Sequence, residues 1–129
     1  MKKLVLATLL TLLSFNANAR CFDEVVNEDW YKCTVREGIT SYKQNDNIFI
    51  IYSAGFLRGN VYALQFTAMK NGYPFLAVTD CTDYSLALVH DIMYDRVKNG
   101  DFKLDNDYHT SLTITQTERF FKCLDKKQQ

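Results

Sequence analysis

Four cysteines constrain the fold of this chain more than any other residues do. They stand at Cys21, Cys33, Cys81 and Cys123, and an even number is typical of a disulfide framework in an exported protein. Their spacing does not suit zinc, which prefers closely spaced cysteine or histidine pairs. Three connectivities are open. We favour Cys21–Cys33, which clips the N-terminal segment, and Cys81–Cys123, which closes a long loop.

The N-terminus has the three parts of a secretory signal peptide. Lys2 and Lys3 supply positive charge, residues 4–15 are apolar, and Ala17 and Ala19 have the spacing of a signal-peptidase site. We expect residues 1–19 to be removed and the periplasm to be the destination. A membrane anchor is the weaker interpretation, because the apolar run is too short to cross a bilayer comfortably.

The mature chain, residues 20–129, has the size of one domain. Without Lys2 and Lys3 it carries 13 basic against 15 acidic residues. A net charge near −2 gives no general reason to bind nucleic acid or an anionic membrane. Pro74 is the only proline and no linker is recognisable, so we expect a single helical domain.

Hydrophobic periodicity predicts three longer helices, over residues 47–71, 84–98 and 112–124. Asp46 or Asn45 can cap the first helix, and glycines follow the first and the second. The pattern of residues 23–44 is weaker and favours a short helix. Because no hairpin turns are recognisable, we expect an all-α, disulfide-stapled domain of about four helices.

The first of these helices contains two glycines one turn apart, Gly55 and Gly59. Each costs a helix about 0.5–1 kcal/mol relative to alanine. We expect both to lie on the core-facing side and to let another backbone, or a ring such as Phe120 or Phe121, approach closely. Gly59→Leu would then destabilise the fold by about 1–3 kcal/mol. The expected core-facing stripe is Ile48, Tyr52, Gly55, Gly59, Tyr62, Phe66 and Met69. Ile51, Leu57 and Val61 widen it, which suggests a central helix buried on more than one side.

Catalytic chemistry is not recognisable in the sequence. His90 lies in a predicted helix and His109 near a loop, and neither belongs to a metal or nucleophile motif. We expect His90 to be a structural histidine. Cysteines held in disulfides cannot act as nucleophiles. The sequence therefore predicts a protein that is not an enzyme and binds no metal or cofactor.

Acidic residues concentrate between positions 80 and 107, where the sequence contains seven aspartates and only three basic residues. Asp91 and Asp95 lie one helical turn apart beside Tyr94. Tyrosine supplies contact area in an interface, and carboxylates attract a positively charged protein as it approaches. These three residues are therefore candidates for binding a basic partner protein. An ordinary solvated surface is the alternative.

The segment Gly55-Phe56-Leu57-Arg58-Gly59 resembles the glycine–aromatic–aliphatic–x–glycine signature of type VI secretion amidase immunity proteins (the Tai/Rap-type family). Cys81 before a helix that begins near Ser85, and a last helix closing on Phe120-Phe121-Lys122-Cys123, are similar as well. The resemblance covers about residues 48–123 and implies a disulfide between Cys81 and Cys123. It also implies a periplasmic immunity protein that binds a peptidoglycan amidase and blocks its active site. Such proteins need no cofactor and commonly form homodimers.

Two other classes stay open. One is a small periplasmic chaperone resembling the acid-stress Hde-type proteins, since the aspartates would lose charge at low pH and release client-binding surface. Those chains are shorter, and four cysteines would restrict a protein that has to open. The other is an accessory of envelope assembly, such as a secretion-system pilotin.

Overall fold

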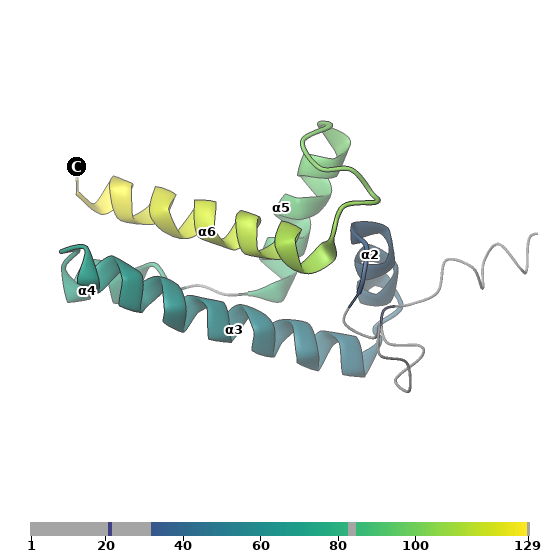
Figure 1. Ribbon diagram of the computed structural model, residues 1–129, viewed down its shortest axis with the longest axis horizontal. Helices are drawn as coiled ribbons and strands as arrows, with labels where there is room; N and C mark the ends of the chain where they lie inside the picture. Colours follow the sequence, from purple (N-terminus) through teal and green to yellow (C-terminus); the bar gives the residue numbers. More distant parts are fainter. Residues whose placement is uncertain (1–20, 22–31, 83–84, 129) are drawn as a thin grey trace, which may run out of the picture.

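The computed structural model describes residues 21, 32–82 and 85–128, and these residues fold into helices (Figure 1). The expected signal peptide lies outside the described residues. No strand occurs in the described part, where Thr34 and Asp107 form an isolated bridge. The all-α class is therefore confirmed. The five described helices are α2 (Val35–Lys43), α3 (Asn47–Lys70), α4 (Phe75–Asp80), α5 (Leu86–Lys98) and α6 (Tyr108–Lys127).

The two longest helices, α3 and α6, form the centre of the molecule. They run side by side in the same direction (Figure 1), so that Ser53 lies beside Tyr108 and Leu57 beside Gln116. Each of the two helices also contacts α2, α4 and α5. α3 is thus central in its contacts, since it touches every other described helix.

The core consists of two hydrophobic clusters that lie at opposite ends of the central pair. The larger cluster joins α2, α3, α5 and the start of α6, and the smaller one joins α4 to the C-terminal halves of α3 and α6. The larger cluster contains Cys21, Cys33, Val35, Phe49, Leu57, Leu86, Val89, Met93, Tyr108 and Leu112. The smaller cluster contains Ala68, Val78, Cys81, Phe120 and Leu124.

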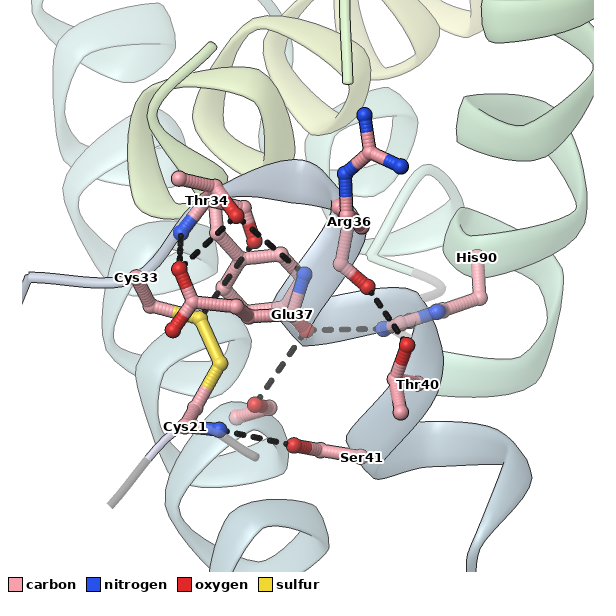
Figure 2. Close-up of a disulfide and its surroundings, with 10 residues drawn as sticks. Cys21, Cys33, Thr34, Arg36, Glu37, Thr40, Ser41 and His90 are labelled. Atoms are coloured by element: carbon pink, nitrogen blue, oxygen red, sulfur yellow. Dashed lines mark hydrogen bonds between the residues drawn. A yellow bond between two sulfur atoms is a disulfide. The ribbon is translucent and has the colours of Figure 1, made fainter. Parts of the chain in front are cut away.

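Both predicted disulfides are present, one beside each cluster. Cys21–Cys33 lies against α2, and the Cys21 N–H donates a hydrogen bond to Ser41 Oγ at 2.9 Å (Figure 2). Cys81–Cys123 joins the end of α4 to α6, with 5.7 Å between the Cα atoms. No free cysteine remains in the chain. Cys81–Cys123 therefore ties the end of α4 to α6, and Cys21–Cys33 ties Cys21 to the chain just before α2.

The helices differ from the prediction in their number and in some of their ends. The short helix α4 follows Pro74 and was not predicted. The last helix begins at Tyr108 rather than Leu112, because the Asp107 carboxylate accepts a hydrogen bond from the Thr110 N–H at 2.8 Å. The residues that follow include the β-branched Thr113, Ile114 and Thr115, but they are helical since Leu112 enters the core. The hydroxyl groups of Ser111, Thr113 and Thr115 donate to carbonyls four residues earlier.

The face of α3 that packs against the rest of the protein is opposite to the predicted one. The spacing of the predicted stripe is helical, but Ile48, Tyr62, Phe66 and Met69 on it are exposed. Tyr52 is partly covered, because its ring contacts the ring of His109. The expectation that α3 is buried on more than one side is therefore wrong. The buried residues of α3 are Phe49, Ser53, Leu57, Val61 and Ala68.

Candidate docking surface

One side of α3 forms an apolar surface that the rest of the described chain leaves uncovered. Its large side chains are well exposed, with Ile51 at 73%, Phe66 at 65% and Tyr62 at 59%. At 3.6 residues per turn they lie opposite the buried face, and in Figure 1 α5 and α6 lie above α3. We call this surface the outer face of α3. It consists of Ile48, Ile51, Gly55, Gly59, Tyr62, Phe66 and Met69.

The two glycines lie in the middle of the outer face. A Cβ atom built on Gly55 or Gly59 meets no heavy atom of the described residues within 4 Å. The prediction that another backbone, Phe120 or Phe121 packs closely on them is therefore wrong. The predicted loss of stability by overpacking in Gly59→Leu is not expected either, because the space there is open. Phe120 is buried in the smaller cluster instead. The fold of the described chain therefore does not use the space that these glycines leave.

The glycine that does permit close packing is Gly38 in α2. A Cβ atom there would overlap the ring of Tyr108, which is fully buried. Sequence reasoning missed this position because it lies in the segment with the weakest pattern. A usable signal was present, since Thr34 and Glu37 form a capping box that marks the start of a helix and places Gly38 inside it.

The charge around the outer face is slightly positive. Residues 47–70 contain no aspartate or glutamate, and their charged residues are Arg58 and Lys70. Phe75 and Leu76, just beyond the end of α3, are exposed as well. Large contiguous apolar surfaces of this kind mark interaction sites in proteins that are otherwise folded and polar. The surface suits a partner that is apolar at its centre and neutral or acidic at its edge.

The candidate residues Asp91, Tyr94 and Asp95 are exposed on α5. Lys43 Nζ and Lys98 Nζ lie 5.0 Å and 5.3 Å from the centre of the Tyr94 ring. Two ammonium groups of the same chain therefore stand beside the ring between the two aspartates in the sequence. The local charge is close to balanced, so this patch has less power to steer a basic partner than the sequence suggested.

The buried polar residues near α2 form a closed network. His90 Nε2 lies 2.7 Å from Tyr108 Oη, and the Tyr108 hydroxyl donates to Ser53 Oγ at 3.2 Å. The His90 ring stacks on Tyr42 at 4.2 Å, and Figure 2 shows His90 beside α2. Burial lowers the pKa of His90 to about 4 and raises that of Tyr108, so both stay neutral at physiological pH. Since His90, Tyr108 and Ser53 are all buried, the network acts as polar packing.

His109 and the described acidic residues do not assemble into a metal-binding group. The His109 ring packs against the rings of Tyr52 and Phe56, and burial lowers its pKa. Among the described residues, no three histidine, cysteine, aspartate or glutamate side chains lie together as metal ligands would. The same residues include no helix with the length and apolar character needed to cross a membrane.

The described chain thus belongs to a structural class, the small all-α domains stapled by two disulfides. No known family model, curated protein or solved structure matches it. The outer face of α3 is the feature of this structure that most calls for a functional explanation.

Proposed function

We propose that this protein is an exported, immunity-type inhibitor that binds a peptidoglycan amidase and blocks its active site. The outer face of α3 docks on the amidase, and no cofactor takes part. The signal-peptide pattern, the two disulfides and the resemblance around Gly55 and Gly59 all support a periplasmic binding protein of this kind.

The observation that carries this proposal is the uncovered pair of glycines between large exposed apolar side chains. Two glycines cost the helix about 1–2 kcal/mol in total, and the described fold gains no contact in return. A partner that approaches the α3 backbone at this point would use the space. Ile51 and Tyr62 flank the glycines and would supply the apolar contact area of the interface.

A second copy of this chain is the competing occupant of the outer face. The face is nearly symmetric about Leu57, since Gly55 and Gly59 lie two residues to either side and Ile48 and Phe66 nine residues to either side. We commit to the amidase because the face lacks acidic residues and suits an acidic-edged partner. Homodimerisation is then an outcome that the experiment has to separate from inhibition.

The test measures complex formation and peptidoglycan hydrolysis with the purified mature protein and the amidase that is co-produced with it. Phe66→Ser removes an exposed ring from the outer face, and Lys122→Gln changes an exposed residue of α6 as the matched control. We expect the wild type and the control to bind and inhibit. The Phe66→Ser variant should lose at least about tenfold in affinity while keeping its melting temperature.

Each other result rejects a stated part of the proposal. No complex, and no protection of cells that export the amidase, rejects the inhibitor function. Full inhibition by Phe66→Ser rejects the outer face as the docking surface, and loss of a homodimer without loss of inhibition assigns the face to a second copy. If the protein binds no amidase but suppresses the aggregation of other proteins at about pH 2–3, the result favours the chaperone function.

A further inference from the structure

The tripeptide Lys-Asn-Gly occurs twice in this chain, at residues 70–72 and 98–100, and each copy ends a helix. Asn71 is the C-cap of α3, and Asn99 is the C-cap of α5. The two glycines that follow have φ angles of 91° and 82°, in the left-handed region that glycine occupies without strain. Helix termination therefore places an asparagine directly before a glycine at two exposed positions.

An asparagine before a glycine can lose its side-chain amide without an enzyme. The glycine backbone nitrogen gives up its proton and attacks the asparagine Cγ atom. A new C–N bond closes a five-membered succinimide ring, and the side-chain nitrogen takes up a proton and leaves as ammonia. Water then opens the ring to aspartate or isoaspartate. Asparagine is thus among the thermolabile residues, and a following glycine favours the reaction because it has no side chain to hinder the attack.

The backbone restrains the two copies in the same way. The ψ angles of Asn71 and Asn99 are 11° and −2°. The N–H group of each following glycine donates at 3.1 Å to the carbonyl oxygen three residues earlier, which belongs to Met69 in one copy and to Val97 in the other. The glycine nitrogen has to leave this hydrogen bond before it can attack. Both copies therefore react only when the last turn opens, and helix ends are the parts that fray first.

The side chains of the two asparagines differ. Asn71 Nδ2 donates to the Thr67 carbonyl oxygen at 2.9 Å, which holds this amide back along α3. Nothing among the described residues forms a hydrogen bond with the Asn99 side chain, which is exposed. Asn71 thus has to break a hydrogen bond before its Cγ atom can turn toward the glycine nitrogen, whereas Asn99 can turn without that step.

We propose that Asn99 is a site of spontaneous deamidation in this protein. Its product is a mixture of aspartate and isoaspartate at position 99. Asn71, in the same tripeptide, is protected by its hydrogen bond to Thr67.

The modification acts on the junction between α5 and α2. Either product adds negative charge at the C-terminal end of α5, where the helix dipole is already negative. Isoaspartate also adds a methylene carbon to the main chain just before residues 101–107. In that loop, the carbonyl oxygens of Leu104 and Asn106 accept from the first two N–H groups of α2. We therefore expect the deamidated protein to melt at a lower temperature than the unmodified protein.

The experiment incubates the purified mature protein at mildly alkaline pH, which favours removal of the glycine N–H proton, and follows both sites by peptide mass spectrometry. We expect Asn99 to react at least about threefold faster than Asn71, the factor expected for one exposed hydrogen bond. The same incubation in urea, with the disulfides intact, is the control. Both copies should then react at the same rate, because each asparagine has the same two neighbours.

Two matched variants assign the reaction. Asn99→Gln lengthens the side chain, which disfavours ring closure, and should remove most of the ammonia that the folded protein releases. Asn71→Gln makes the same change in the other copy of the tripeptide and should remove little. The deamidated protein is then separated by charge and melted beside the unmodified protein. An unchanged melting temperature would reject the predicted weakening of the junction.

Equal rates at the two sites of the folded protein, or a faster reaction at Asn71, overturn the proposal. It also fails if neither asparagine reacts in the folded protein while both react in urea, because the fold then protects the two sites alike. A difference that persists in urea contradicts the role of the Thr67 hydrogen bond. Amidase inhibition enters none of these measurements, so the result is independent of the proposed function.

Discussion

Two regions of this protein carry glycine inside a helix, and they differ in what fills the space. At Gly38 in α2, the fully buried ring of Tyr108 occupies the place of the missing side chain. At Gly55 and Gly59 in α3, nothing in the described chain comes within 4 Å of that place. The three glycines have the same intrinsic cost to a helix, but only Gly38 gains packing from this fold.

The difference separates a glycine that the fold requires from two that the described fold does not require. Gly38 belongs to the junction that brings α2, His90 and the start of α6 together, so a side chain there would push the core apart. Gly55 and Gly59 can accept a side chain without any clash within the described chain. Under the proposed function, a partner and not the stability of the monomer accounts for their presence.

The largest expected effect concerns acidification of the junction around Gly38. His90 has a pKa of about 4 in the folded protein against an ordinary 6.5, so the unfolded chain binds more protons between these values. The stabilising contribution of neutral His90 is therefore fully present above about pH 6.5. The free energy of unfolding falls by about 3 kcal/mol as the pH drops to 4. His109, whose pKa is also lowered by burial, acts in the same direction.

Urea unfolding at pH 7 and pH 5 measures this loss, which should reach about 2 kcal/mol at pH 5 from His90 alone. His90→Gln keeps a polar side chain but cannot take up a proton, so its stability should change less over the same range. An equal pH dependence in the two proteins would show that the junction is not the acid-sensitive part of the fold.

Gly38→Ala should have the next largest effect. The added methyl group meets the Tyr108 ring, and we expect the free energy of unfolding to fall by about 1–3 kcal/mol in spite of the better helix propensity of alanine. Thermal or urea unfolding tests this. An unchanged or raised stability would mean that Tyr108 moves aside easily, and the contrast between the two glycine regions would disappear.

Gly55→Ala and Gly59→Ala should shift stability in the opposite direction. Each replaces glycine in an open part of α3, so each should raise the free energy of unfolding by about 0.5–1 kcal/mol. The same variants should bind the amidase more weakly, because the added methyl groups occupy the docking space. A variant that is less stable than the wild type would show that the described chain does use this space.

Phe66→Ser should give the smallest change in stability. Its ring is 65% exposed on the outer face, and exposed substitutions usually alter the free energy of unfolding by less than about 0.5 kcal/mol. Unfolding curves that superimpose on those of the wild type would support an uncovered face. A large loss of stability would show that Phe66 packs against the monomer.

Several parts of this structure follow from the sequence alone because their causes are local. Asp46 caps α3 as predicted, since its carboxylate accepts from the Ile48 and Phe49 N–H groups at 3.2 Å and 3.3 Å. The helical class, the course of α3 and both disulfide pairings were also predicted. Periodicity, capping residues and an even cysteine count act over a few residues or on chain connectivity, and a single sequence contains that information.

The tertiary structure alone decided which side of α3 is buried. This helix is apolar on two opposite sides, so its periodicity fits either orientation equally well. The choice depends on residues far along the chain, among them Tyr108 beside Ser53 and Gln116 beside Leu57. These contacts hold the Phe49–Leu57 side against α6, and the side with Gly55 and Gly59 is left for solvent or a partner.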